Sequence, residues 1–231
     1  MPSVEPHIVP LGDGAAVVRL GAAGDPATSA RVRAFAGALK HRVLAGVTEY
    51  VPAYATVTVF YDPLVRGFTE LAAELAELAR QAATGPAPPG RELVVPVCYG
   101  GELGPDLGFV AAYCGLREDE VVALHAGASY RVALVGFVGG FPYLEGLPAR
   151  LAVPRLDHPR PYVAPGSVAL AGRQAGIYTL GSPGGWRLIG RTPLVLFDAT
   201  RSEPAAFEVG DRVRFEPIGL DDYERLAGGR P

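Results

Sequence analysis

The residues that most strongly suggest chemistry are arginines in the second half of the chain. Residues 125–198 carry seven arginines and only three acidic groups, whereas the whole chain has a formal net charge of −3. The same segment is dense in the glycine and proline that form turns. A guanidinium group binds carboxylate or phosphate oxygens through paired hydrogen bonds. The segment therefore predicts a site for a small anion; the alternative is that the arginines are scattered, solvated surface charges.

Three segments of this half combine glycines with aromatic and polar side chains, namely 136–144, 163–178 and 182–193. Glycine lets a backbone approach a ligand closely, and aromatic rings can line its binding site. Amide and hydroxyl groups can donate hydrogen bonds to a small amide and accept them from it. Each segment alone also has a structural explanation. Residues 136–144 would form a barrel corner, the glycines and proline of 163–178 would only form turns, and the tryptophan of 182–193 would fill a barrel end. We expect residues 130–198 to form a concave receptacle, with Gln174 and Tyr178 as catalytic candidates and with substrate contacts from Gly140, Phe141, Arg155, Arg187 and Arg191.

His125 is the third catalytic candidate. It lies late in a predicted helix over residues 117–126. One role for this histidine is general acid–base catalysis or contact with the substrate. The alternative is a surface histidine whose cationic form the helix dipole stabilises. The four histidines show no metal-ligand spacing, and the two cysteines, Cys98 and Cys114, cannot form a zinc site by themselves. The sequence therefore predicts no metal site and two small, buried, apolar cysteines.

The elements that must position these residues fall into two parts. In the first part, hydrophobic periodicity predicts strands at 14–20, 47–52, 55–61 and 92–98 and helices at 26–44 and 68–83. Asp25 followed by Pro26 indicates the start of the first helix. This β-α-β-β-α-β order is typical of a ferredoxin-like domain. The Gly/Pro-rich residues 85–90 predict a linker, which gives domains at 1–90 and 91–231.

The second part has a different pattern, with short helices and many short apolar runs. Short helices are predicted at 105–114, 117–126 and 220–227. Between the second and third of these helices, apolar runs alternate with Gly/Pro turns and predict short strands at 130–136, 167–171, 176–180, 185–189, 193–197 and 212–217. Many short strands with little helix indicate a sandwich or a closed barrel, and closure would hide the strand edges.

Composition excludes several classes of protein. Apolar residues make up 49% of the chain and charged residues 19%, which excludes general disorder. No apolar run reaches the roughly 18 residues of a membrane span, and the N-terminus lacks a signal-peptide pattern. The pI of 5.8 and the lack of a basic run argue against nucleic acid. We expect a cytoplasmic protein that binds neither membrane nor nucleic acid.

Three motifs, in this order along the chain, resemble one family: GFVGGFPYLEGLP, VAPGSVALAGRQAGIY and SPGGWRLIGRTPLVLFD. The resemblance extends over nearly the whole chain through GDGAAVVRL, VPAYATVTVFYDP, VPVCYGGELGPDL and FEVGDRVRFEPI. The family comprises the B subunit of 5-oxoprolinase, the KipI-type kinase inhibitors and the allophanate hydrolase subunit 1 proteins, which carry carboxyltransferase subdomains C and D. One position departs from it: Gly139 stands where the family often has proline, which leaves that loop less constrained.

The resemblance implies an α+β fold with an N-terminal ferredoxin-like domain and a C-terminal cyclophilin-like β-barrel. It implies a component of ATP-dependent 5-oxoprolinase, inactive alone, that works with the A and C subunits to open 5-oxo-L-proline to L-glutamate. The carboxylate of this small anionic amide suits arginine, and its lactam suits Gln174 or Tyr178. The chain has no Walker A sequence, so we expect the ATP site to be shared with or held by a partner.

The same family implies two alternatives. A KipI-type regulator would bind a sensor histidine kinase and block its autophosphorylation, and it needs no small-molecule site. A carboxyltransferase part of a urea carboxylase would require a biotin carrier elsewhere. The enzyme component is the main prediction, because the arginine-rich half suits a small acid.

Overall fold

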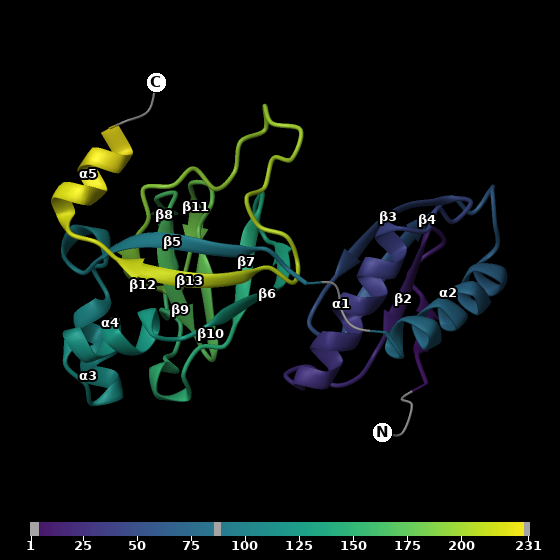
Figure 1. The fold of residues 1–231 in the computed structure, drawn as a ribbon, viewed down its shortest axis with the longest axis horizontal. Coiled ribbons are helices and arrows are strands. Elements are labelled where there is room, and N and C mark those ends of the chain that lie inside the picture. Colours follow the sequence, from purple (N-terminus) through teal and green to yellow (C-terminus); the bar gives the residue numbers. More distant parts are fainter. Residues whose placement is uncertain (1–4, 86–88, 229–231) are drawn as a thin grey trace. The chain divides into compact units, whose positions relative to one another are not determined.

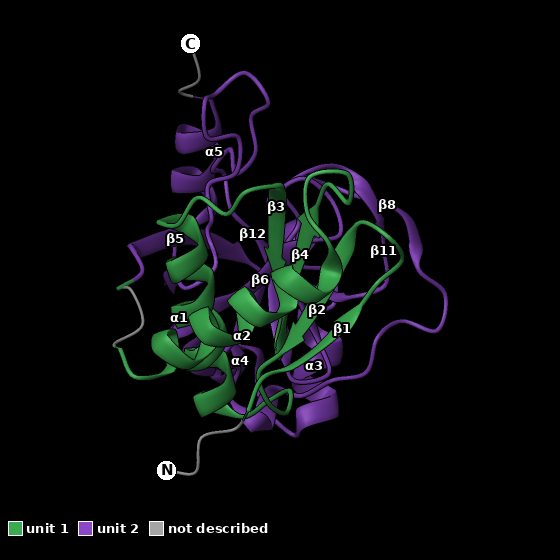
Figure 2. Ribbon diagram, turned by 90° about the vertical axis from the view of Figure 1, so that its right-hand side faces the viewer, with its two compact units in different colours: residues 1–89 green, residues 90–231 purple. Residues whose placement is uncertain are grey.

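The computed structural model describes residues 5–85 and 89–228. The chain divides into two compact units, residues 1–89 and 90–231 (Figure 2). The predicted linker over residues 85–90 falls partly on residues 86–88, which lie outside the described residues. No helix among the described residues is long and apolar enough to cross a membrane.

Unit 1 is an antiparallel sheet of four strands packed against two helices. The strand order is β1-β2-β4-β3. The core lies between the sheet and the helices, since alternate strand residues such as Val18, Val57 and Val59 are buried with Phe35 and Leu75 from the helices. The elements are β1 (His7–Pro10), β2 (Ala15–Arg19), α1 (Pro26–Lys40), β3 (Val47–Pro52), β4 (Thr56–Tyr61) and α2 (Phe68–Ala83).

Helix α1 begins where the sequence predicts. The Asp25 carboxylate accepts hydrogen bonds from the backbone N–H groups of Ala27 and Thr28, and Pro26 occupies the first helical turn. The helix ends at Lys40 rather than at residue 44. Val43 would continue the apolar face of a helix that reached residue 44, but its side chain is 99% exposed.

The strand predicted at 92–98 does not belong to the sheet of unit 1. It is β5 (Glu92–Tyr99), a barrel strand of unit 2 that pairs in parallel with β13 (Arg212–Pro217). The sheet position beside β2 is filled instead by β1, which pairs antiparallel with β2 across a short turn. The predicted strand order therefore needs correction: a strand before the first predicted one completes the sheet.

Unit 2 is built on a closed barrel with the strand order β10-β7-β6-β13-β5-β12-β9 (Figure 1). Closure leaves no unpaired barrel edge, and it decides between the two architectures that the sequence left open. The remaining barrel strands are β6 (Tyr130–Gly136), β7 (Phe141–Glu145), β9 (Ser167–Ala171), β10 (Gln174–Ile177) and β12 (Arg187–Arg191). Strands β8 (Arg160–Val163) and β11 (Ser182–Gly184) form a separate two-stranded sheet. The helices of unit 2 are α3 (Leu107–Cys114), α4 (Glu118–Ala126) and α5 (Leu220–Gly228).

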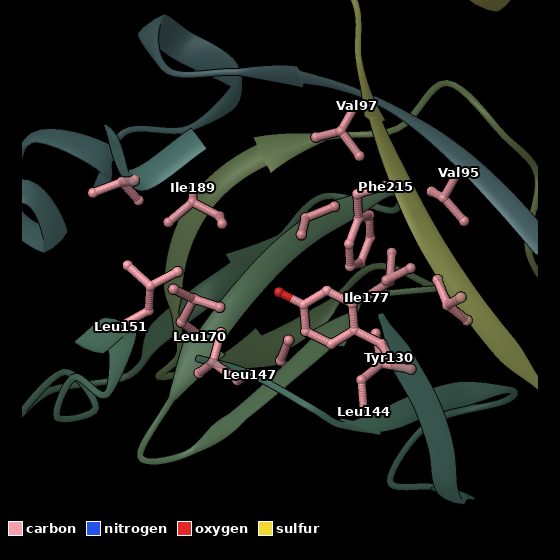
Figure 3. Close-up of a cluster of buried hydrophobic side chains, with 14 of the residues drawn as sticks. Val95, Val97, Tyr130, Leu144, Leu147, Leu151, Leu170, Ile177, Ile189 and Phe215 are labelled. Carbon is pink, nitrogen blue, oxygen red and sulfur yellow. The ribbon is translucent and has the colours of Figure 1, made fainter. Parts of the chain in front are cut away.

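The barrel interior is a packed apolar core (Figure 3). Inward-facing residues of its strands include Val97, Leu144, Leu170 and Ile189, all fully buried, and Tyr130 fills the space between them. Protein cores are packed as densely as organic crystals, so such an interior leaves no room for a ligand. The expected receptacle over residues 130–198 is therefore wrong for the barrel interior, and any ligand site must lie outside it.

The predicted strand at 193–197 is absent; within it only Phe197 forms a bridge, to Ala205. Pro193 lacks the N–H that a ladder needs, and Leu194 and Val195 are exposed rather than packed. Strands β7, β8 and β11 are not predicted from the sequence, because each is short and contains proline.

Candidate functional site on the outer face of the barrel

A second buried cluster of unit 2 lies on the outer face of the barrel. Neighbouring residues of a strand point to opposite faces. In β9, Val168 and Leu170 belong to the interior core, whereas Ala169 and Ala171 belong to the outer cluster. The outer cluster also contains Phe141, Val163, Tyr178, Trp186 and Leu188.

Aromatic side chains dominate this outer face, and we call them the aromatic cluster: Phe137, Phe141, Tyr143, Tyr178 and Trp186. The Phe141 ring centroid lies 5.2 Å from that of Tyr178 and 5.5 Å from that of Trp186, and both pairs meet edge to face. The Tyr143 and Trp186 centroids are 5.7 Å apart. Such edge-to-face contacts orient rings as well as bury them. All three segments singled out in the sequence therefore meet here.

Phe137 stands out within the aromatic cluster because its backbone has a φ of 66°. It is the only non-glycine residue with positive φ among the described residues. Its side chain is 62% exposed and meets Phe141 edge to face at 5.8 Å between ring centroids. Strained backbone at an exposed aromatic residue is characteristic of ligand sites.

The loop that carries Phe137 is anchored on both sides. The Gly139 carbonyl accepts a hydrogen bond from the Thr179 hydroxyl. A Cβ on Gly139 would lie only 2.8 Å from the Phe197 ring, so glycine at this position lets that ring pack against the loop. Gly140 is buried with a φ of 76°, which glycine adopts at little cost. Gly139 therefore allows close packing here, and the loop is not left unsupported.

The three predicted arginines make different contacts. The Arg155 guanidinium carbon is 5.7 Å from the centre of the Trp186 ring, so Arg155 borders the aromatic cluster. Arg187 instead stacks on Phe109, with 3.6 Å between its guanidinium carbon and the ring centre. Arg191 is half-buried, and its Nε has no hydrogen-bond partner among the described residues. Arg155 thus contacts the cluster, while Arg187 contacts Phe109 of α3 and donates a hydrogen bond from Nε to the Pro154 carbonyl at 3.3 Å.

Gln174 and Tyr178 share the outer face of the barrel. Gln174 is paired with Ala171 and Gly176 with Ala169, and both alanines belong to the outer cluster. Directly paired residues point to the same face, so Gln174 lies on this face as well. Burial raises the pKa of the Tyr178 phenol, against the lowering effects of the backbone N–H of Trp186 and of the charges of Arg155 and Arg160. The phenol is therefore protonated near neutral pH and can donate a hydrogen bond.

His125 lies in the core and not on the surface, so the surface alternative is wrong. It is fully buried, and its ring packs 4.4 Å from Phe215 and 5.3 Å from Tyr130 between centroids. Its Nδ1 is 2.8 Å from the Tyr99 hydroxyl. Burial lowers its pKa to about 3, which keeps the ring neutral at pH 7 despite its place near a helix C-terminus. These contacts separate His125 from the aromatic cluster.

The buried neutral state of His125 makes stability depend on pH. The unfolded chain binds a proton on this residue below about pH 6.5, but the folded chain does not until about pH 3. The contribution of His125 to the free energy of unfolding is therefore fully present above pH 6.5 and is lost as the pH drops. Between pH 6.5 and 5, wild type is expected to lose about 1–2 kcal/mol more of its free energy of unfolding than His125→Gln. Urea unfolding at both pH values measures this difference; equal losses would contradict the assignment.

In the described part of the chain, histidine, cysteine, aspartate and glutamate side chains form no cluster of three or more that could hold a metal ion. Cys98 and Cys114 are free and half-buried, so the prediction of full burial is wrong in degree. Burial raises the pKa of both thiols, which lowers the fraction of reactive thiolate.

Two polar residues beside the aromatic cluster do not stand out as site candidates in the sequence. Asp106 is buried and pairs with Arg160, with 2.9 Å between Oδ1 of Asp106 and Nη2 of Arg160. In the sequence, Arg160 is one of the seven arginines of residues 125–198, and Asp106 is one residue of the motif VPVCYGGELGPDL. A contact between residues 54 positions apart has no local sequence pattern, so only the tertiary structure reveals it.

Known proteins resemble this chain over almost its whole length. Residues 6–207 match the family described as carboxyltransferase domain, subdomain C and D. The 5-oxoprolinase B subunit of Bacillus subtilis is 38% identical over 96% of each chain, and that of Escherichia coli O157:H7 is 44% identical over 74% of this chain and 78% of its own.

Among solved structures, TTHA0988 superposes with a TM-score of 0.78 and 38% identity over 88% of this chain. The matched region makes up 40% of the longer TTHA0988 chain. The family match and the curated relatives agree with the resemblance carried by the three sequence motifs. The chain therefore belongs to the carboxyltransferase subdomain C and D family, together with proteins named as the B subunit of 5-oxoprolinase.

Proposed function

We propose that this chain is the B subunit of an ATP-dependent 5-oxoprolinase. With the A and C subunits, it opens the lactam of 5-oxo-L-proline to give L-glutamate, and it is inactive alone. The observation that carries this proposal is the 38% identity to a 5-oxoprolinase B subunit that extends over 96% of both chains. The same proposal includes a ferredoxin-like fold for unit 1, in which β1 takes the place of the fourth predicted strand, and a cyclophilin-like fold for unit 2.

The aromatic cluster suits such a substrate. A 5-oxoproline molecule is a small apolar ring that carries one carboxylate and one cyclic amide. The exposed Phe137 ring and the half-buried Tyr143 ring can pack against such a ring. Arg155, whose guanidinium carbon lies over the Trp186 ring, supplies a positive charge for the carboxylate. The protonated Tyr178 hydroxyl can donate to the lactam oxygen, with Gln174 on the same face as a second polar contact.

ATP is the co-substrate of the proposed complex. An unstrained lactam is a poor electrophile, and ATP supplies the free energy that its hydrolysis lacks. The sequence contains no Walker A motif, and we assign phosphate contacts to a partner protein of the complex. The task of this chain is then to bind and orient the acid and its amide.

Tyr178→Phe tests the hydrogen bond to the lactam. The variant keeps the ring that packs against Phe141 and removes only the hydroxyl. In the assembled complex we expect kcat/KM for 5-oxoproline to fall about tenfold, the value of one ordinary hydrogen bond. Tyr162→Phe is the matched control, because Tyr162 is exposed in the same unit. Unchanged kcat/KM in the Tyr178 variant would remove Tyr178 from the site.

Reconstitution tests the function itself. The purified chain is combined with the A and C subunits from the same source, and ATP-dependent release of glutamate from 5-oxoproline is followed with and without this chain. We expect activity only in the complete mixture, and equal activity without the chain would reject the proposal. Inhibition of a sensor histidine kinase stays a prediction from the resemblance; an inhibitor needs no small-molecule site, so Tyr178→Phe would inhibit as well as wild type.

A further inference from the structure

Asp106 occupies the N-cap position of α3 but does not cap that helix. Aspartate at this position usually accepts a hydrogen bond from the first turn of its own helix. Here Oδ2 accepts instead from the backbone N–H of Leu188 at 2.7 Å, and Oδ1 accepts from Arg160 at 2.9 Å. The Asp106 N–H also donates to the Leu188 carbonyl at 2.9 Å. Asp106 is therefore held rigidly between β12 and the Arg160 side chain.

Arg160 is only partly satisfied by this contact. Its Nη2 donates to Asp106, whereas its Nη1 is buried and has no hydrogen-bond partner among the described residues. A buried donor on a charged group without a partner costs at least about 1–3 kcal/mol, so proteins seldom keep one without a use. The Asp106 carboxylate fixes one side of the guanidinium and leaves the other side for an acceptor.

Arg160, whose Nη1 is unpaired, lies next to the aromatic cluster. Arg160 in β8 is paired with Gly184 in β11. Gly184 in turn lies against the Tyr178 hydroxyl, since a Cβ on this glycine would come within 2.2 Å of that oxygen. The charges of Arg155 and Arg160 both lower the pKa of Tyr178, which places both guanidinium groups within electrostatic reach of the phenol.

We propose that Arg160, held by Asp106, binds the carboxylate of the substrate beside the aromatic cluster through its unpaired Nη1. This inference rests on the proposed function and names a second guanidinium group, besides that of Arg155, that recognises the acid. Arg160 is then a substrate-binding residue, and Asp106 is a positioning residue that acts through it.

The charge of the site favours a carboxylate over a phosphate group. Of the three charged groups that we assign to the site, Arg155 and Arg160 are cationic and Asp106 is anionic, so together they carry a single net positive charge. A carboxylate carries one negative charge, whereas a phosphate monoester carries about −1.5 to −2 at pH 7. A planar guanidinium also matches the planar carboxylate, and the neighbouring rings suit a small cyclic body better than a hydrated phosphate.

The test uses the assembled complex with wild type, Arg160→Gln, Asp106→Asn and the control Arg173→Gln. Arg173 is exposed in the β9–β10 hairpin, so its variant removes the same charge from the same unit. Two compounds are compared: 5-oxoproline as substrate, and 5-oxoprolinamide, which lacks the carboxylate, as a competitive inhibitor. Inorganic phosphate is a third arm that reports a phosphate site.

For Arg160→Gln we expect KM for 5-oxoproline to rise at least about tenfold with little change in kcat, as for the loss of a charge-assisted hydrogen bond. Inhibition by the amide should not change. Asp106→Asn should raise KM in the same selective way by about threefold or more, and Arg173→Gln should leave all constants unchanged. Phosphate should not compete with 5-oxoproline at millimolar concentration.

Three results would overturn the inference while leaving the proposed function intact. In the first, the Arg160 variant keeps the wild-type KM. In the second, affinity for acid and amide falls equally, which indicates a structural effect. In the third, phosphate competes and its inhibition is lost in the Arg160 variant. If the wild-type complex does not turn over 5-oxoproline at all, the proposed function fails and this inference falls with it.

Discussion

Replacing Gly104 with alanine is expected to lower the free energy of unfolding of unit 2 by about 3 kcal/mol or more. A Cβ at this position would lie 2.2 Å from the Ile189 carbonyl oxygen and 2.7 Å from the Gly100 nitrogen. Both neighbours are backbone atoms, so no side-chain rotation can relieve the clash. The segment that leads into α3 would have to move away from β12, which also breaks the contacts of Asp106 with Leu188.

Urea unfolding followed by circular dichroism measures this loss, and a low yield of folded protein would agree with it. Gly219→Ala is the control, because nothing lies within 4 Å of its added Cβ. We expect the control to stay within about 0.5 kcal/mol of wild type. A Gly104 variant as stable as the control would show that the contact between this segment and β12 is looser than described.

Trp186→Ala is expected to lower the free energy of unfolding by about 3–5 kcal/mol. The side chain is 6% exposed and packs against Phe141 and Tyr143, so its removal leaves a cavity on the outer face of the barrel. It also removes the ring beside which Arg155 lies, and affinity for 5-oxoproline should fall with stability.

The control for packing is Trp186→Phe, which keeps an aromatic ring and should cost less than half as much. Since Trp186 is the only tryptophan of the chain, unfolding of both variants is followed by circular dichroism instead of fluorescence. A loss below about 1 kcal/mol for the alanine variant would mean that Trp186 is not part of a packed cluster. In wild type the same tryptophan offers a probe, and its emission should change when 5-oxoproline binds.

Local pattern was sufficient for many elements. The predicted helix over residues 68–83 and the strands 130–136, 167–171 and 212–217 coincide with the observed ones. In these segments periodicity and the flanking turn residues agree, and few tertiary contacts compete with them. The three motif segments, which the sequence places in one predicted receptacle, meet in the aromatic cluster.

The order of residues alone shows which side chains are apolar, where the tight turns fall and which family the chain resembles. Only the tertiary structure decided that β5 joins the barrel, that His125 is buried, that the barrel interior is filled and that Asp106 meets Arg160. The physical reason is that strand partners and side-chain neighbours far apart in the chain are chosen by barrel closure and core packing. Neither leaves a local signature around the residues that it brings together.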